Sequence, residues 1–247
     1  MTQQSFPGPG HVYDVIIVGA GITGTEAALS CAKAGLDVLL VTTSLDTIYN
    51  LLGDGVVLQP KAGTFMAEAF TRLADEQGFV RNWSMHRAGK YEVEHTQGIH
   101  FLQSSVSSLL VENGCVKGVN TWEGVSRFAK ATALCVGSFL KARLSIGELT
   151  ETAGRLSEMS YDDLFLDLEK QGFVFKELTL EARFEDESLP YTVSCKVFAP
   201  DELEPQSFRL KRLEGLYGAG LCASGVLSYE EAALQGQELA NSLLSHL

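Results

Sequence analysis

The stretch that decides the fold lies near the N-terminus, at residues 14–43, and reads DVIIVGAGITGTEAALSCAKAGLDVLLVTT. Its apolar run at 15–18 predicts a buried parallel strand. A G-x-G-x-x-G turn at 19–24 follows this strand directly and opens a helix predicted over 22–34. A second apolar run at 38–41 predicts the next strand, so the segment is a βαβ unit.

Each glycine of the turn has its own steric reason. Gly19 allows the tight turn out of the strand, Gly21 lets a pyrophosphate approach the backbone, and Gly24 lets the helix pack on the strand. Free N–H groups and the positive end of the helix dipole then favour a phosphate at the helix N-terminus. Ala28 and Gly35 extend the pattern, which resembles the FAD fingerprint of flavoproteins with two dinucleotide-binding domains. The alternative is a glycine-rich turn that binds nothing.

The end of the second strand departs from the dinucleotide-binding pattern. An Asp or Glu is usual there because it holds the adenosine ribose, but this sequence continues Val41-Thr42-Thr43. A threonine hydroxyl can still hydrogen-bond a ribose, without the strength that the charge of a carboxylate adds. Asp46 is the next acid along the chain, and we expect it to lie beyond the strand end.

Composition limits the class of protein. The 247 residues, 45% of them hydrophobic, suit one large domain with at most a small appendage. A net charge of −12 suits a soluble, cytoplasmic protein and argues against autonomous nucleic-acid binding. The five cysteines are scattered and lack a C-x-x-C pair, so neither a disulfide framework nor a metal site is predicted. We find no signal peptide and no run that would span a membrane.

The remaining chain predicts a mixed α/β fold. After the βαβ unit we expect helices over 62–77 and 82–96, a strand from 101, a β-meander over 107–130 and a short strand over 133–136. The C-terminal part predicts a strand ending at Gly218-Ala219-Gly220 and a helix opened by a capping box, in which Ser228 precedes Glu231 by three residues. The fold class is therefore a Rossmann-like, FAD-binding parallel sheet with a β-meander and a small α+β appendage.

We divide the chain accordingly. Residues 1–12 are expected to form a disordered tail, 13–149 the first part of the FAD-binding domain, and 150–212 a small appendage on the substrate side. Residues 213–247 return to the FAD-binding domain with its last strand and helix.

Three segments, in order along the chain, carry a resemblance to a known family. They are DVIIVGAGITGTEAAL with LLVTTSLDTI, then RFAKATALCVGSFLKARLSIG, and finally GLYGAG with SYEEAALQG. Together they resemble the FAD domain of the GidA (MnmG) family of tRNA-modifying flavoproteins. The resemblance covers about two-thirds of the chain and implies the same fold and an FAD cofactor.

The departures from that family bear on function. Its members are more than twice as long, with an inserted substrate domain and a helical C-terminal domain that holds tRNA and a GTPase partner. This chain ends soon after the Y-E-E-A-A helix, and the family's C-N-P-A-I-G-G loop is replaced by YNLLGDGVVLQPKAG, without a cysteine. We therefore expect the flavin site to carry over and the full-length tRNA activity not to, which describes a short GidA-related flavoprotein.

The expected cofactor-binding residues come from the turn and from the segments that match the family. They are Gly19, Ala20, Gly21, Ile22, Thr23, Gly24, Thr42, Thr43, Val106, Gly137, Ser138, Gly220, Tyr229 and Glu230. Val106 would pass beside the adenine or would be an ordinary core valine. Gly137-Ser138 would bring a turn against the cofactor or would simply end a strand. Gly220 would let the backbone approach the ribityl or phosphate groups.

The helix that starts at Tyr229 would lie near the pyrimidine end of the flavin, where its N-terminus would stabilise negative charge on the ring. Alternatively, Glu230 and Glu231 are first-turn acids that favour the helix dipole. No catalytic residue is assigned. Cys222 is the one cysteine expected near the isoalloxazine, where a thiolate could react or a thiol could be inert. Candidate contacts for a substrate anion are Arg87, Lys141, Arg143 and Arg155.

The predicted function is an FAD-dependent oxidoreductase. Its substrate is a small molecule or another, unknown compound, and NAD(P)H is a possible reductant. A first alternative is a flavoprotein subunit of a tRNA-uridine modification system, which needs a separate protein partner to supply the missing domain. A second is a non-catalytic FAD-binding regulatory protein. Reduction of the bound flavin by NADH or NADPH would separate an enzyme from a binding module.

Overall fold

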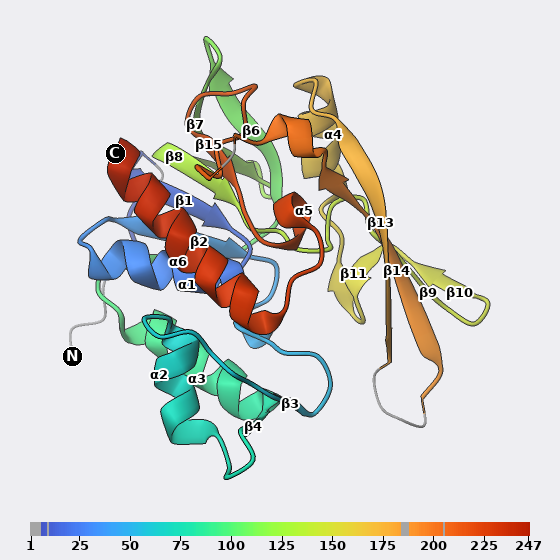
Figure 1. Ribbon diagram of the computed structural model, residues 1–247. Helices are drawn as coiled ribbons and strands as arrows, with labels where there is room; N and C mark the ends of the chain where they lie inside the picture. Colours follow the sequence, from blue (N-terminus) through green and yellow to red (C-terminus); the bar gives the residue numbers. More distant parts are fainter. Residues whose placement is uncertain (1–5, 9, 184–187, 205) are drawn as a thin grey trace.

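The computed structural model describes residues 6–8, 10–183, 188–204 and 206–247 (Figure 1). Within these residues, a seven-stranded central sheet follows the order β5-β2-β1-β8-β7-β6, with β15 beside β8. The strands are β1 (Val12–Val18), β2 (Val38–Thr42), β5 (Ile99–Gln103), β6 (Val106–Glu112), β7 (Cys115–Thr121), β8 (Ser126–Leu134) and β15 (Leu216–Gly218). Strands β5, β2, β1, β8 and β15 run parallel, whereas β6, β7 and β8 form the antiparallel meander. The predicted Rossmann-like sheet with its β-meander is confirmed.

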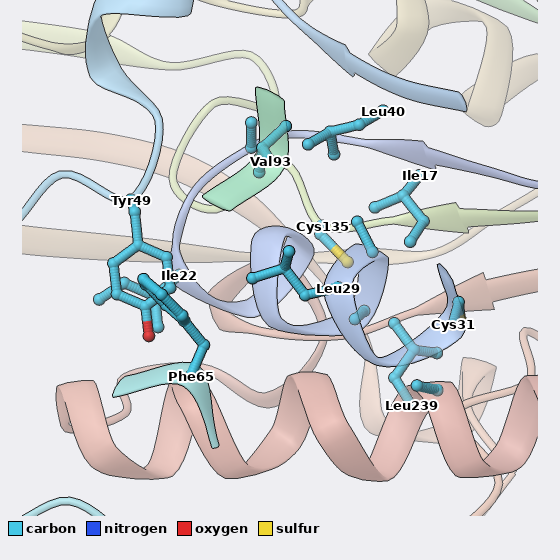
Figure 2. Close-up of a cluster of buried hydrophobic side chains, with 14 of the residues drawn as sticks. Ile17, Ile22, Leu29, Cys31, Leu40, Tyr49, Phe65, Val93, Cys135 and Leu239 are labelled. Carbon is cyan, nitrogen blue, oxygen red and sulfur yellow. The ribbon is translucent and has the colours of Figure 1, made fainter. Parts of the chain in front are cut away.

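Helices cover both faces of the parallel strands. On one face lie α1 (Ile22–Lys33), α2 (Phe65–Leu73), α3 (Asn82–His95) and the long C-terminal α6 (Tyr229–His246), whereas α4 (Asp162–Lys170) packs on the other face (Figure 1). Side chains of β1 and β2 alternate between the two cores: Ile17 and Leu40 face α1, and Ile16 and Leu39 face α4. Figure 2 shows Ile17 and Leu40 beside Leu29 of α1. Two-sided burial explains the continuous apolar runs of the two strands.

A buried carboxylate joins α1 to α2. Glu26 is only 1% exposed and accepts hydrogen bonds from the Tyr49 hydroxyl at 2.5 Å and from the first two N–H groups of α2, those of Phe65 and Met66, at 2.9 and 2.8 Å. Burial raises the pKa of Glu26, and the three hydrogen bonds oppose that shift. The carboxylate of a residue in α1 thus accepts hydrogen bonds from the free N–H groups at the N-terminus of α2, as a capping side chain would.

Helix α6 crosses α1 at a glycine. A Cβ built on Gly236 would lie 2.4 Å from the Thr23 carbonyl oxygen and 2.6 Å from the Glu26 Cβ. Such distances leave no room for a side chain, so only glycine allows this approach of the two helices. The N-terminus of α6 carries the predicted capping box, with the Ser228 hydroxyl and the Glu231 carboxylate each bound to the other's backbone N–H.

A second, four-stranded antiparallel sheet lies beside the central one. Its order is β10-β9-β14-β13, made of β9 (Arg143–Ile146), β10 (Leu149–Glu151), β13 (Phe175–Arg183) and β14 (Pro190–Phe198), and the small hairpin of β11 (Ala153–Arg155) and β12 (Glu158–Met159) lies next to it. The sheet starts at Arg143, before the boundary that we placed at residue 150. Helix α4, which lies within 150–212, packs into the core of the central sheet. The division into domains stays a prediction.

Several local features differ from expectation. The strand predicted over 133–136 is the end of the nine-residue β8, because small buried residues such as Ala131 and Thr132 continue the pairing with β1. Sequence patterns also missed η1 (Leu45–Thr47), η2 (Pro200–Glu202), α5 (Leu221–Ser224) and the hairpin of β3 (Gly55–Val57) and β4 (Phe79–Arg81). Each of these elements is only one short turn or strand, too short for a periodic pattern.

The predicted tail at 1–12 lies partly outside the described residues, at 1–5 and 9. Its described part is packed rather than free. The Phe6 ring contacts that of His100 and lies under the Arg127 guanidinium, His11 pairs with Asp37 at 2.5 Å, and β1 already begins at Val12. The described part of the segment thus makes aromatic and ionic contacts, and the disordered tail as a whole stays a prediction.

The close packing of α1 and α6 predicts whether a substitution at Gly236 raises or lowers the free energy of unfolding. Glycine to alanine inside a helix usually stabilises a protein by about 0.5–1 kcal/mol, but Gly236→Ala adds a methyl group against backbone atoms of α1. We expect the free energy of unfolding to fall by about 1–3 kcal/mol, as for other overpacked sites. Asn241→Ala, at an exposed position of the same helix, is the matched control and should be neutral or slightly stabilising. Denaturant or thermal unfolding measures both, and a stabilised Gly236→Ala variant would contradict the packing.

Candidate cofactor site

Four parallel strands end together at one edge of the central sheet. Val18 of β1 pairs with Val41 of β2 and with Leu134 of β8, and Leu134 pairs with Gly218 of β15. The loops that follow these strands therefore start side by side, where open parallel sheets bind their ligands. A cleft of about 560 Å³ opens at this edge. The predicted cofactor residues that line it are Gly19, Ala20, Gly21, Ile22, Thr23, Thr42, Thr43, Gly137, Ser138, Gly220, Tyr229 and Glu230.

The glycine turn leaves space and hydrogen-bond donors on the side of the cleft. A Cβ built on Gly21 meets no atom within 4 Å, whereas one on Gly19, with φ at +103°, would lie 2.3 Å from the Cys135 carbonyl oxygen. Helix α1 begins after Gly21 with no capping side chain and no acid in its first turn. Its first N–H groups are thus available to an anion, and the arrangement fits a pyrophosphate.

The third glycine of the motif has a packing role. A Cβ on Gly24 would lie 1.9 Å from the Gly19 carbonyl oxygen, and Gly24 does not line the cleft. Gly220 closes the turn from the other side, with φ at +75° and its Cβ position 3.0 Å from the Thr23 hydroxyl oxygen. That hydroxyl donates to the Ala232 carbonyl of α6 at 3.0 Å. The motif therefore holds α1, β15 and α6 together around one corner of the cleft.

The end of β2 presents hydroxyl groups. Thr42 and Thr43 line the cleft, and so does Thr47 of η1. The Thr42 hydroxyl donates to the Ser44 carbonyl at 3.1 Å. Asp46, by contrast, is 90% exposed and pairs with Lys90 at 3.2 Å, outside the cleft. The expectation that Asp46 lies beyond the strand end is confirmed.

The loop after β8 forms the next part of the wall. Gly137 adopts φ of +54°, and the Ser138 hydroxyl donates to the Gly154 carbonyl of β11 at 2.8 Å. This hydrogen bond joins the central sheet to the β11–β12 hairpin. Gly137-Ser138 follows the end of β8 at Leu134, with two residues between, and lines the cleft, and its contact with the cofactor stays a prediction.

The start of α6 holds a neighbouring loop. The Tyr229 hydroxyl accepts from the Leu52 N–H at 2.9 Å, and the Glu230 carboxylate accepts from the Gln59 N–H at 2.8 Å. Burial alone would raise the pKa of Glu230, but the hydrogen bonds from backbone and side chain outweigh it and lower the pKa. With Glu231 engaged in the capping box, the two first-turn acids favour the dipole alternative. The segment 52–59 that they hold is the one that replaces the family's C-N-P-A-I-G-G loop.

Two predicted residues lie away from the cleft. Val106 is fully buried in the core on the α4 side, which favours the ordinary core valine. Cys222 is also fully buried, with its thiol 3.3 and 3.4 Å from the carbonyl oxygens of Ala219 and Leu134. Burial raises the pKa of Cys222 to about 12. An inert thiol therefore fits this geometry better than a nucleophile, which must ionise.

Arg155 is the only Lys or Arg among the described residues that line the cleft. Its guanidinium lies 3.4 Å from the Glu158 carboxylate. Of the other candidate anion contacts, Arg143 pairs with Asp162 at 2.8 Å, and Arg87 and Lys141 lie over the aromatic rings of Trp83 and Phe165. These three do not line the cleft.

Sequence patterns missed the outer walls of the cleft. One wall comes from β13 and β14, another from the β3 region, and a third from the β11–β12 hairpin with the start of α4. The missed lining residues include Thr47, Asn50, Leu52, Val56, Val57, Leu58, Phe139, Glu158, Tyr161, Leu180, Ala182, Tyr191 and Val193. Alternation of apolar and polar residues from Leu178 predicts a half-buried strand in the region of β13, and a further strand is predicted over 191–198. What covers their apolar side depends on contacts far apart in the sequence, which no local pattern reports.

Neither a metal centre nor a membrane span is found in the part of the chain that the structure describes. No group of three or more His, Cys, Asp or Glu side chains there could hold a metal ion. None of its helices is both long and apolar enough to cross a bilayer.

The fold and the cleft define a protein of the Rossmann-like class, the fold of dinucleotide-binding domains. The family model described as "Glucose inhibited division protein A" matches residues 14–191. The chain belongs to this GidA family, a family of FAD-binding flavoproteins with a Rossmann-type fold.

Two comparisons define its place in the family. A crystal structure of the GidA-related protein from Thermus thermophilus is 39% identical, with a TM-score of 0.85 over 96% of this chain and 100% of that one. The tRNA uridine 5-carboxymethylaminomethyl modification enzyme MnmG of Chlamydia caviae is 32% identical over an alignment of 195 residues, and the match covers 67% of this chain and 31% of the enzyme. The chain thus spans about a third of the length of the curated relatives it matches. Aquifex aeolicus GidA, 17% identical with a TM-score of 0.82 over 94% of this chain and 63% of that one, shares the fold.

The cysteine environments predict a labelling pattern. Burial raises the pKa of Cys31 and Cys222 to about 12, of Cys195 to about 11, and of Cys135 still further. Cys115 is partly exposed, and its pKa is raised chiefly by the hydrogen bond to Glu214 at 3.1 Å.

We expect an alkylating reagent at neutral pH to modify Cys115 alone in the native protein, faster as pH rises, and all five cysteines after unfolding. Mass spectrometry of the labelled peptides measures this. Cys115→Ser should abolish native labelling, and Cys222→Ser should leave it unchanged. Rapid native labelling of Cys222 would restore it as a candidate nucleophile.

Proposed function

We propose that the protein binds FAD in this cleft and acts as an FAD-dependent oxidoreductase related to the tRNA-modifying GidA flavoproteins. The observation that carries the proposal is the uncapped N-terminus of α1 behind Gly21, at the edge where four strands end. Its free donors and open space fit a pyrophosphate, which FAD has and FMN lacks. We further propose a cytoplasmic location, in keeping with the acidic composition and the five unpaired cysteines.

In this proposal each wall has a task. The N–H groups of α1 bind the pyrophosphate, and the hydroxyls of Thr42 and Thr43 face the adenosine side. The apolar side chains of the 52–59 segment and of β13 and β14 exclude water from the other part of the cleft. Bound FAD would supply the redox chemistry, and the protein would supply binding, orientation and electrostatics. A reductant such as NAD(P)H and the substrate are not assigned to any residue.

The subunit alternative rests on the similarity to MnmG relatives, which are named for tRNA modification. In this alternative the protein acts in tRNA modification together with a protein partner. The non-catalytic alternative predicts that bound FAD is not reduced by NADH or NADPH, which anaerobic absorbance spectra would detect.

We predict that the purified protein is yellow and that heat releases FAD, identified by chromatography. Gly21→Val should abolish flavin binding and leave the chain folded, because the added side chain meets no protein atom but fills the pyrophosphate path. Gly10→Val is the matched control, since Gly10 also has open space and lies outside the cleft. Occupancy follows from absorbance, and folding from circular dichroism. A colourless protein that FAD cannot reconstitute would refute the proposal.

We also predict that the isolated chain does not bind tRNA with useful affinity. Its 31 acidic and 19 basic side chains give a surface that repels a polyanion. The sequence has three short basic clusters, Arg127/Lys130, Lys141/Arg143 and Arg209/Lys211/Arg212. One residue of each is paired with an acid: Lys130–Asp14, Arg143–Asp162 and Arg212–Glu202, at 2.7, 2.8 and 2.6 Å.

Fluorescence anisotropy at about 150 mM salt tests this prediction, since the electrostatic part of nucleic-acid binding is strongly weakened there. A basic RNA-binding protein serves as the positive control. Sub-micromolar binding by this chain alone would favour an autonomous role in tRNA modification.

A further inference from the structure

We propose that Glu158 holds the adenosine ribose of FAD, in place of the acid that is missing from the end of β2. The inference rests on the proposed FAD binding and adds to it a ribose-binding residue from a different part of the chain. In dinucleotide-binding folds a carboxylate about twenty residues after the glycine turn accepts a hydrogen bond from the ribose. Here Thr42 and Thr43 occupy that position, and in this proposal the carboxylate that binds the ribose comes from another part of the chain.

Glu158 reaches the end of β2 from the β11–β12 hairpin. The Thr47 hydroxyl donates to the Glu158 carboxylate at 3.0 Å, although the two residues are 111 positions apart. Both line the cleft together with Thr42 and Thr43. The Glu158 side chain is only 12% exposed, so its carboxylate is largely shielded from bulk solvent. Glu158 itself forms part of the cleft wall.

The neighbours of Glu158 hold its carboxylate in place. The Arg155 guanidinium lies 3.4 Å from one carboxylate oxygen, and Thr47 binds the other. Tyr161 adjoins the same corner: burial raises its pKa, a hydrogen bond with Thr43 opposes the shift, and the Glu158 charge adds to it. A carboxylate has about four acceptor positions, so Thr47 and Arg155 leave room for a ribose hydroxyl.

No other acid described at the cleft or at the β2 end has these properties. Asp46 is 90% exposed and pairs with Lys90 outside the cleft. Glu230 lines the cleft, but its carboxylate already accepts from the Gln59 N–H. Glu181 lines it from the exposed side of β13, in the other sheet. Among these four acids, Glu158 alone lies in hydrogen-bond contact with the segment that follows β2.

The test compares ribose recognition in variants of the full chain. The dissociation constant of FAD is measured by flavin fluorescence for the unaltered protein, Glu158→Gln and Glu158→Ala. ADP and 2′-deoxy-ADP are then compared as competitors for each variant. Asp46→Asn and Glu181→Gln are matched controls, each removing one negative charge, the first outside the cleft and the second within it. Circular dichroism and thermal unfolding monitor folding.

We expect the unaltered protein to prefer ADP to 2′-deoxy-ADP by roughly tenfold, the effect of one hydrogen bond to a charged group. Glu158→Ala should lose this preference, Glu158→Gln should weaken it, and both controls should keep it. A merely structural Glu158 would change unfolding or overall affinity and leave the preference unchanged, which would overturn the inference. If the unaltered protein bound no FAD at all, the proposed function itself would fail, and this inference with it.

Discussion

The parallel pairing of β1 with β2 and β8 is the constraint on which the rest of the structure depends. Because Val18, Val41, Leu134 and Gly218 lie in register, the loops after four strands are brought to one edge. Burial on both faces fixes that register, since a shift by one residue would turn each strand's side chains to the opposite core. The cleft is therefore a consequence of strand pairing before it is a property of any one motif.

The Y-E-E-A-A-x-Q-G motif acquires a physical meaning from the same arrangement. Tyr229 and Glu230 hold the 52–59 segment, Gln235 accepts the Gly220 N–H at 2.7 Å, and Gly236 allows the close approach to α1. The Ala232 carbonyl accepts from Thr23 of the glycine turn. In this chain the residues of the motif make structural contacts. These contacts hold α6, the glycine turn and the cleft wall in fixed positions relative to one another.

Local patterns predicted the βαβ unit, the meander and the capping box because each depends on residues close together in sequence. The position of Asp46 beyond the end of β2 was predicted from the length of the strand, whereas its position outside the cleft is known from the structure. Glu158 could not be found in this way, since its partner Thr47 is 111 residues distant and nothing in the sequence near it marks a binding site. The outer walls escaped prediction for the same reason: they join β13, β14 and the β11–β12 hairpin to loops of the central sheet. Val106, predicted either to pass beside the adenine or to be an ordinary core valine, has its side chain in the core on the α4 side, and the adenine contact stays a prediction.

The cleft is held open by contacts that need no ligand. The Tyr49 N–H donates to the Ala20 carbonyl at 3.0 Å, the Leu51 N–H donates to the Asn82 side chain at 2.8 Å, and Leu52 and Gln59 are held by α6. A loop fixed at several points loses little further conformational freedom when a cofactor binds, so less of the binding energy is spent on ordering it. The same contacts explain how a segment without the family's cysteine loop can still form a wall: its backbone is positioned by hydrogen bonds, and its side chains contribute only apolar surface. A preformed apolar wall beside an uncapped helix N-terminus combines the two surfaces that the proposed cofactor needs, one for an aromatic ring and one for an anion.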